Sequence, residues 1–360
     1  TANFNQVETG YFLRNSSNLV GSTFNTIGNA KIFLKASNIN SVGIKDSVSV
    51  PITLFSGVNS YNKYRNNIIT NCYSGIRSFG YSGGTTPNLT NGRYNEITGN
   101  TITGFGGTST ATYGIYTNLQ MFITVSNNII VSGPGSTNAI YGINMVGNTF
   151  GSVDVNSNTV TLTSGTTSQI VSPIYVAGTP GNSASIRSHC NIRNNVIKDL
   201  NLPSNSGAFY GIFASGSNSP DTMSVTGNVI KNSTIGTTNA TCAMYYVQGA
   251  TVNLNVSNDS VYNVTKNSAS TNFYFIYSGA SLGNNGIASI NNNYIANNSV
   301  NAGTTVYGIF DNGSANANQY FVSNNTITDI TTANSGIAYG IYTNTGNNRF
   351  TYNNKVNSII

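Results

Sequence analysis

One histidine and nine acidic residues are the groups in this chain that could carry out acid–base chemistry. His189, the sole histidine, lies in the stretch IRSHCNIR between Arg187 and Arg193. Such a base, flanked by cations, could take a proton from an acidic substrate. Enzymes that cleave acidic sugar polymers also need acids close by, either as paired carboxylates or as a calcium-binding cluster. The positions of the acids therefore decide whether His189 has partners.

The acids are scattered along the chain. They are Glu8, Asp46, Glu96, Asp154, Asp199, Asp221, Asp259, Asp311 and Asp329. When the chain is aligned by the repeat described below, only two pairs of acids fall in the same column, that is, at the same position of the repeat. These pairs are Glu96 with Asp154 and Asp199 with Asp329. Each pair is at least two repeats apart, roughly 10 Å at strand spacing. We therefore expect no catalytic site, no metal and no cofactor, and we place His189 in a solvated loop.

Composition narrows the class of protein. Charged residues make up 7% of the chain, against about 25% in soluble domains, and Asn, Ser, Thr and Gly replace them. Such a polar but weakly charged chain favours a secreted or cell-surface protein. The net charge of +6 reflects few acids and no run of Lys or Arg, which argues against nucleic-acid binding. No apolar stretch is long enough to span a membrane.

The three cysteines, Cys72, Cys190 and Cys242, are far apart and show no CxxC spacing. An odd number at such distances fits neither a disulfide framework nor a zinc site. We interpret them as small buried hydrophobic residues.

An asparagine pair recurs along the chain, as in VSNNTITDI from Val322 to Ile330. If the second residue of each pair is position zero, the gaps run from 28 to 37 residues and average about 32. Two residues later every copy has Ile or Val, and two residues earlier every copy has a polar or amphipathic residue. This alternation predicts short strands with one buried face. The ten positions are Asn67, Asn100, Asn128, Asn158, Asn195, Asn228, Asp259, Asn293, Asn325 and Asn354.

A second motif follows about 16 residues later, with forms such as TYGIYTN, FYGIFAS and VYGIFDN. The residue after its central Ile is aromatic in seven of nine copies, and Arg77 and Asn144 are the exceptions. By strand alternation this column faces away from the Ile column. It is either an exposed ladder for sugar rings or another subunit, or a stacked core. Its members are Tyr116, Tyr175, Phe213, Tyr246, Tyr277, Phe310 and Tyr342.

A unit of strands and turns that repeats in constant phase can stack its equal columns on one another. An Asn tolerates a left-handed bend, and its amide can bond the Asn above and below it. We therefore predict an all-β fold, a parallel β-helix solenoid of about 10–11 rungs with a roughly 32-residue repeat. Residues 1–60 are expected to be degenerate rungs or an N-terminal cap, and residues 61–360 regular repeats.

The NNxI pattern, from about Tyr64 to Ile359, resembles the right-handed parallel β-helix superfamily, which includes pectate lyases and many bacterial surface proteins. NNTITDI followed by YGIY is also similar to long repeat proteins that Bacteroidota export by type IX secretion. In those proteins such rungs form adhesin or filament segments.

The resemblance implies an extracellular structural or adhesive segment, not an enzyme, whose partners are other subunits of a surface assembly or cell-surface glycans. The alternative is a glycan-binding or lyase-like β-helix in which His189 is the base. Regular Thr-x-Thr columns, which an ice-binding solenoid requires, are missing. Because YNNKVNSII stops within a rung, we expect the solenoid to continue in a longer protein or to be covered by a partner.

Overall fold

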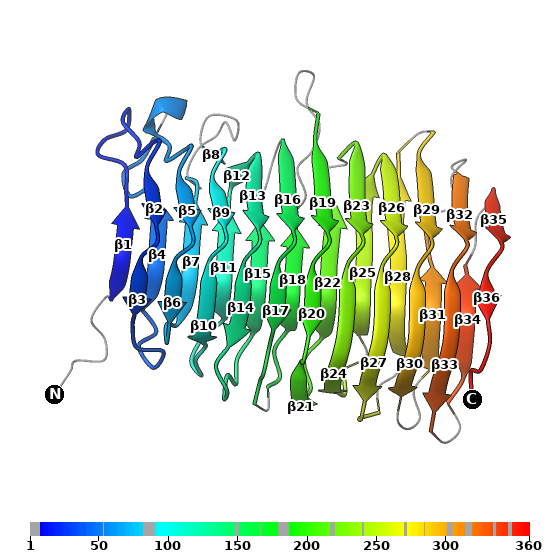
Figure 1. Ribbon diagram of the computed structural model, residues 1–360. Coiled ribbons are helices and arrows are strands. Elements are labelled where there is room, and N and C mark those ends of the chain that lie inside the picture. Colours follow the sequence, from blue (N-terminus) through cyan, green and yellow to red (C-terminus); the bar gives the residue numbers. More distant parts are fainter. Residues whose placement is uncertain are drawn as a thin grey trace.

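The computed structural model is a parallel β-solenoid whose strands stack side by side along one axis (Figure 1). About nine turns separate the first and last positions of the asparagine repeat, and further coils precede them. The fold predicted from the sequence is confirmed. The structure describes residues 8–52, 54–81, 91–147, 151–165, 167–178, 187–216, 220–239, 241–269, 272–283, 285–300, 305–313, 319–333, 336–344 and 348–360, and no side chains at 203 and 204.

Three parallel sheets form the walls of the solenoid. Sheet 1 contains β1 (Thr9–Leu13), β4 (Val42–Ser47), β7 (Ser74–Phe79), β11 (Thr112–Asn118), β15 (Ile140–Val146), β18 (Val171–Ala177), β22 (Phe209–Gly216), β25 (Cys242–Thr251), β28 (Asn272–Leu282), β31 (Thr305–Asp311) and β34 (Ala338–Thr343). Its strands carry the YGI motif.

Sheets 2 and 3 lie on either side of the asparagine pair. Sheet 2 contains β2 (Thr26–Gly28), β5 (Lys63–Arg65), β9 (Glu96–Thr98), β13 (Ile123–Ser126), β16 (Ser152–Asn156), β19 (His189–Arg193), β23 (Thr222–Thr226), β26 (Asn253–Ser257), β29 (Ile287–Asn291), β32 (Gln319–Ser323) and β35 (Arg349–Tyr352). Sheet 3 contains β3 (Lys31–Phe33), β6 (Ile68–Thr70), β10 (Thr101–Phe105), β14 (Ile129–Ser132), β17 (Thr159–Thr161), β20 (Val196–Lys198), β24 (Val229–Thr237), β27 (Ser260–Lys266), β30 (Tyr294–Val300), β33 (Thr326–Thr332) and β36 (Lys355–Val356), and β21 (Asn201–Asn205) pairs with β24. The short pair β8 (Gly92–Arg93) and β12 (Gln120–Met121) and the 3-10 turn η1 (Phe55–Gly57) lie outside these sheets.

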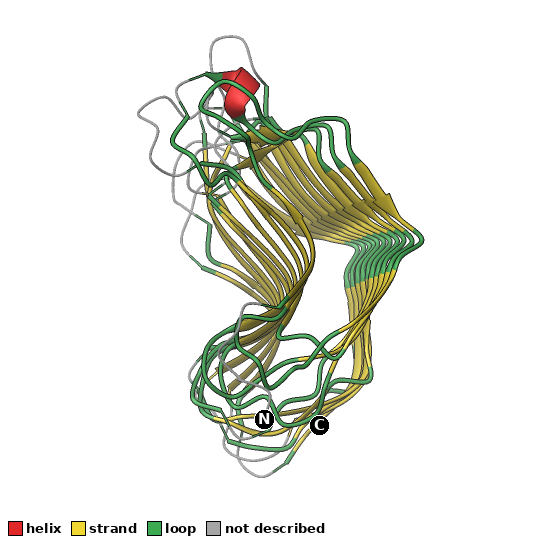
Figure 2. Ribbon diagram, turned by 90° about the vertical axis from the view of Figure 1, so that its left-hand side faces the viewer, coloured by secondary structure: helices red, strands yellow, loops and turns green. Residues whose placement is uncertain are grey.

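Viewed along the axis, the three sheets surround a packed interior (Figure 2). The bend between sheets 2 and 3 follows nearly the same path in every coil, whereas the other two corners differ from coil to coil. Equal columns meet in register: Ile115 pairs with Ile143, and Ile102 with Ile130. Each coil thus buries the Ile and Val residues that a single 32-residue unit could not bury alone.

Sheet 1 bends inward along its middle, so its outer face is concave (Figure 2). The glycine of the YGI motif explains this close approach. A Cβ atom on Gly114 would lie 2.5 Å from Cγ2 of Ile130 in sheet 3, and one on Gly308 would lie 2.9 Å from Cδ1 of Ile327. In these coils the missing side chain lets sheet 1 contact sheet 3, whereas Met244 in β25 and Phe275 in β28 fill the same register position with buried side chains.

Candidate functional site

The asparagine ladder is a continuous network of buried hydrogen bonds. The backbone N–H of Asn195 donates to Oδ1 of Asn228 at 3.0 Å, and its Nδ2 donates to the same oxygen at 2.9 Å. The Nδ2 group also donates to the carbonyl oxygen of Val155 in the preceding coil at 2.9 Å. The same three bonds recur at the neighbouring positions, so one amide satisfies backbone and side-chain groups of three coils. This confirms the predicted ladder.

The left-handed backbone belongs to the first residue of the pair, not to the ladder residue as the sequence suggested. Asn66, Asn194 and Asn324 have φ of 53° to 55°, whereas the buried second residue has no positive φ. The first residue makes the turn, and the second points its amide inward. Asn, Gly or Ser occupies this first position in every coil, because such residues tolerate the left-handed region or hydrogen-bond locally.

Asp259 is the one acid in the ladder, and it is buried. Its Oδ1 accepts bonds from the backbone N–H of Asn228 at 2.7 Å and from Nδ2 of Asn228 at 2.9 Å. Its Oδ2, which replaces an amide nitrogen, has no hydrogen-bond partner. Burial holds the pKa of this carboxyl well above its usual value, and the two bonds from Asn228 oppose the rise.

A second ladder, not predicted from the sequence, lies at the corner between sheets 1 and 2. The N–H and Nδ2 of Asn25 donate to Oδ1 of Asn62, and the N–H of Asn62 donates to Oδ1 of Asn95. The residue before each Asn is aromatic and left-handed, and these rings stack 4.7 to 5.2 Å apart. The stacked residues are Phe24, Tyr61 and Tyr94, and Phe122, which precedes Ile123, continues the stack; their φ values run from 52° to 59°. The stretches TFNTI, SYNKY and RYNEI contained this signal.

The predicted aromatic column lies on the outer face of sheet 1. Its rings contact their copies in the next coil: Tyr246 and Tyr277 stack with centroids 4.3 Å apart, and Phe310 and Tyr342 stack 5.2 Å apart. Exposure varies along the column, from 6% for Phe213 to 37% for Tyr342. The column is thus neither core nor freely exposed, but a self-stacked layer on the concave face.

A second aromatic column, missed in the sequence, runs beside the first. It is formed by the tyrosine two residues before the central Ile, in YGI and, in β28, in YFI: Tyr113, Tyr141, Tyr210, Tyr274, Tyr307 and Tyr339. Both columns face outward because Gly and Ile of the motif are consecutive inward residues, as the burial of Gly308 and Ile309 shows. The two columns contact each other, for example Tyr307 with Phe310 at 4.9 Å. Together they form the aromatic face of the solenoid, defined here by the residues of both columns.

Stacking within the aromatic face limits what it can bind. The flat faces of Tyr246, Tyr277 and Phe310 are covered by neighbouring rings 4.3 to 5.5 Å away. Ring edges and hydroxyl groups are therefore the parts that reach solvent. Burial raises the pKa of Tyr274 to about 12, so its hydroxyl stays protonated at neutral pH. The face offers hydrogen-bond donors and acceptors on an apolar base.

Glu96 and Asp154, which share a column, are each bound to a cation. Glu96 and Asp154 both lie in register with Thr124, one on each side of it, as predicted. Glu96 pairs with Arg65 at 2.8 Å, and Asp154 pairs with Arg193 at 3.3 Å. These are surface ion pairs, which contribute about 0–1 kcal/mol each.

His189 begins β19 in sheet 2 and is partly buried, so it is not in the loop that we expected. Its neighbour Arg187 pairs with Asp221 at 3.1 Å. Within the described part of the chain, His189 itself forms no ion pair. Asp199, directly after β20, and Asp329, within β33, lie at exposed left-handed positions, with φ of 53° each. Asp154 in β16 and Asp221 just before β23 lie on the two sides of β19, and each forms its ion pair with an arginine and not with His189.

Asp46 is buried on the inner face of sheet 1, within a polar network at the N-terminal coils. Its carboxylate accepts hydrogen bonds from Nδ2 of Asn59 at 2.7 Å, from the Tyr64 hydroxyl at 2.6 Å and from the Ser78 hydroxyl at 3.1 Å. Burial raises its pKa to about 6, and the three hydrogen bonds limit the rise.

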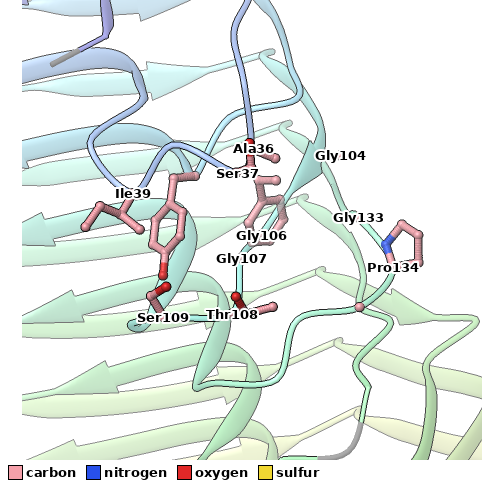
Figure 3. A pocket seen from close by; sticks show the side chains of 13 residues that line it. Ala36, Ser37, Ile39, Gly104, Gly106, Gly107, Thr108, Ser109, Gly133 and Pro134 are labelled. Carbon is pink, nitrogen blue, oxygen red and sulfur yellow. The ribbon is translucent and has the colours of Figure 1, made fainter. Parts of the chain in front are cut away.

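A cavity of 230 Å³ lies at the corner between sheets 3 and 1, where glycine-rich bends of successive coils lie together (Figure 3). Gly104, Gly106, Gly107 and Gly133 line it, and no charged residue does. The hydroxyl of Tyr73 donates to the Thr110 carbonyl oxygen at 2.7 Å. The cavity thus offers shape and backbone groups but no charge.

The cysteines are free and buried, and burial raises the pKa of each thiol to about 12. This agrees with their interpretation as small hydrophobic residues. Across the described ranges, no three His, Cys, Asp or Glu side chains gather where they could share a metal ion. No helix in that part of the chain has the length and apolarity to cross a membrane.

Comparison with known proteins gives no relative: no family model, curated protein or solved structure matches this chain. The ladders and the aromatic face are therefore the basis for any functional conclusion.

Proposed function

We propose that this chain is a structural and adhesive segment of a secreted or cell-surface protein and has no catalytic activity. The observation that carries the proposal is that the recurring side chains join one coil to the next. Asn amides join the coils inside the bend between sheets 2 and 3, and aromatic rings join them on the outer face of sheet 1. A rod reinforced along its whole length suits a spacer or filament.

The extracellular location is supported by composition. With 7% charged residues, the surface is polar mainly through neutral Asn, Ser and Thr side chains. The resemblance to repeat proteins exported by type IX secretion points the same way. In this proposal the partners are other subunits of a surface assembly or cell-surface glycans.

The aromatic face is the proposed adhesive surface. Its tyrosine hydroxyls can bond sugar hydroxyls, and its ring edges provide apolar contact. Phe213 and Phe310 occupy the same column as the tyrosines, which shows that the stack accepts a ring without a hydroxyl. We therefore expect that hydroxyl groups can be removed without disturbing the stack.

The second candidate is a lyase-like β-helix that cleaves polysaccharides. The concave outer face of sheet 1 (Figure 2) favours it, since a concave surface suits an extended polymer. The pairing of Glu96, Asp154 and Asp221 with cations weighs against it.

Two experiments separate the candidates. Purified protein should show no turnover of polyuronates or neutral glycans, with or without calcium; turnover that disappears in His189→Ala would overturn the non-enzymatic role. For adhesion, protein-coated beads should adhere to glycan-coated surfaces, and the triple variant Tyr274→Phe, Tyr277→Phe and Tyr307→Phe should adhere less. Tyr262→Phe, on the outer face of sheet 3, is the control. Equal adhesion of variant and control would refute the adhesive role of the face.

A further inference from the structure

Two cations replace aromatic rings at the N-terminal end of the aromatic face. Lys45 in β4 and Arg77 in β7 occupy the column that holds Tyr116 in β11. They are register neighbours, so their backbones are one strand spacing apart, about 4.8 Å. Like charges directly opposite each other on neighbouring strands destabilise a sheet. Two neighbouring cations at such a position call for an explanation by binding.

Other neighbouring cations in this solenoid have an acid beside them. Lys63 and Arg65 share Glu96, at 3.4 and 2.8 Å. Lys198 and Lys231 are register neighbours in sheet 3, and Lys198 lies 3.9 Å from Asp199. Lys45 and Arg77 form no ion pair within the described residues, which include all nine acids.

The two side chains are instead held by rings and one hydroxyl, and they diverge from each other. Nζ of Lys45 lies 4.9 Å from the ring of Phe12, in the preceding coil. The guanidinium of Arg77 lies 5.6 Å from the ring of Tyr113, in the following coil, and donates to the Ser74 hydroxyl at 2.9 Å. Its Nε is buried without a hydrogen-bond partner. Both charges therefore remain uncompensated.

The surrounding coils strengthen the positive potential. Residues 1–98 contain eight Lys and Arg and three acids, a net charge of +5 out of +6 for the whole chain. One of these three acids, Asp46, is buried on the opposite face of β4. An anion approaching this end of the aromatic face thus meets a positive surface.

We infer that Lys45 and Arg77 form a subsite for the oxyanion groups, carboxylate or sulfate, that recur along an acidic glycan whose chain lies along the aromatic face. Guanidinium and ammonium groups bind such oxyanions by charge-assisted hydrogen bonds. The adjoining tyrosine edges suit a hydroxyl-rich chain better than a membrane, which would need exposed apolar surface. This inference rests on the proposed adhesive role and adds the charge of the ligand.

The test compares polymers with one backbone: dextran, carboxymethyl-dextran and dextran sulfate, with binding measured by biolayer interferometry. Wild-type protein should bind at least one charged dextran at least tenfold more tightly than dextran, and the affinity should fall as salt concentration rises. Lys45→Gln/Arg77→Gln should lose that tenfold preference, and Lys45→Gln alone should lose part of it. The matched control Lys198→Gln/Lys231→Gln should change affinity less than twofold. Thermal melting checks that each variant keeps the fold.

The results distinguish the alternatives. Preference for carboxymethyl-dextran or for dextran sulfate identifies the oxyanion. Equal loss in the subsite and control variants would mean nonspecific charge attraction and would overturn the subsite. Binding to anionic phospholipid vesicles without binding to charged dextrans would also overturn the subsite. Tyrosine-dependent adhesion to neutral glycans, without charge preference, would leave the adhesive role standing and refute only the subsite.

Discussion

Replacing the one acid of the ladder should stabilise this protein. In other rungs, the Nδ2 group donates to a carbonyl of the preceding coil and to Oδ1 of the next ladder residue, as Asn293 does to Val256 at 3.1 Å and to Asn325 at 2.9 Å. Asp259 places an oxygen there, and that oxygen is buried and unpaired. Asp259→Asn restores both donors without changing the shape of the side chain.

The magnitude follows from those two bonds. A buried unsatisfied polar group costs about 1–3 kcal/mol, and each new hydrogen bond contributes about 0.5–1.5 kcal/mol. We expect Asp259→Asn to raise the free energy of unfolding by about 2–3 kcal/mol at pH 7. Urea unfolding followed by circular dichroism measures this difference, with the amide exchange rate of Asn228 as a local readout.

The pH dependence gives a second, independent check. The folded-state pKa of Asp259 lies well above the unfolded value, which is near 3.8. The folded state therefore binds the proton more tightly, and wild-type stability falls as pH rises from about 4. The advantage of Asp259→Asn should be large at pH 7 and shrink to under about 1 kcal/mol at pH 3, where a protonated carboxyl can donate one bond.

A matched variant reverses the change. Asn195→Asp puts an acid into a rung where Nδ2 donates to Val155 and Asn228, so it should destabilise the protein at pH 7 and less so at pH 3. If Asp259→Asn were no more stable than wild type at pH 7, or if its advantage were the same at both pH values, the argument from the unpaired oxygen would be wrong.

Three further predictions test the fold. Asn195→Leu and Asn325→Leu should each destabilise by about 1–3 kcal/mol for every ladder group left unpaired, and unchanged melting of both would show that the column is not a buried network. The pKa of Asp46 is about 6 in the folded state against the ordinary value of 3.8, so its contribution should lower wild-type stability by about 3 kcal/mol as pH rises from 4 to above 6. Asp46→Asn should flatten this part of the plot of urea midpoint against pH. An unaltered plot would exclude Asp46 as the source of the fall. Gly308→Ala would place Cβ 2.4 Å from the carbonyl oxygen of Gly340 and should cost about 1–3 kcal/mol, whereas Gly28→Ala, no closer than 3.3 Å to any neighbour, should cost less in the same unfolding assay.

The amino-acid sequence was sufficient to predict the solenoid and its main ladder. Asn and Ile recur at fixed offsets in units of about 32 residues. Copies in equal phase can satisfy every amide only by stacking in register, so the period itself specifies the fold. The weaker second ladder of Asn25, Asn62 and Asn95 covers few coils, and its short run hid it among many other asparagines.

The composition of the aromatic face depended on the tertiary structure. Strict alternation would put Tyr307 on the same side as Ile309, pointing inward, and only one aromatic column outward. In the solenoid, Gly308 and Ile309 both face inward, and Phe275 and Ile276 do so in the preceding coil. The two consecutive inward residues therefore belong to the bend of sheet 1, and they reverse the direction of every side chain before them. Lys45 and Arg77 lie 32 positions apart in the sequence, one repeat, and strand register makes them neighbours; the rings that hold the two side chains are known only from the tertiary structure.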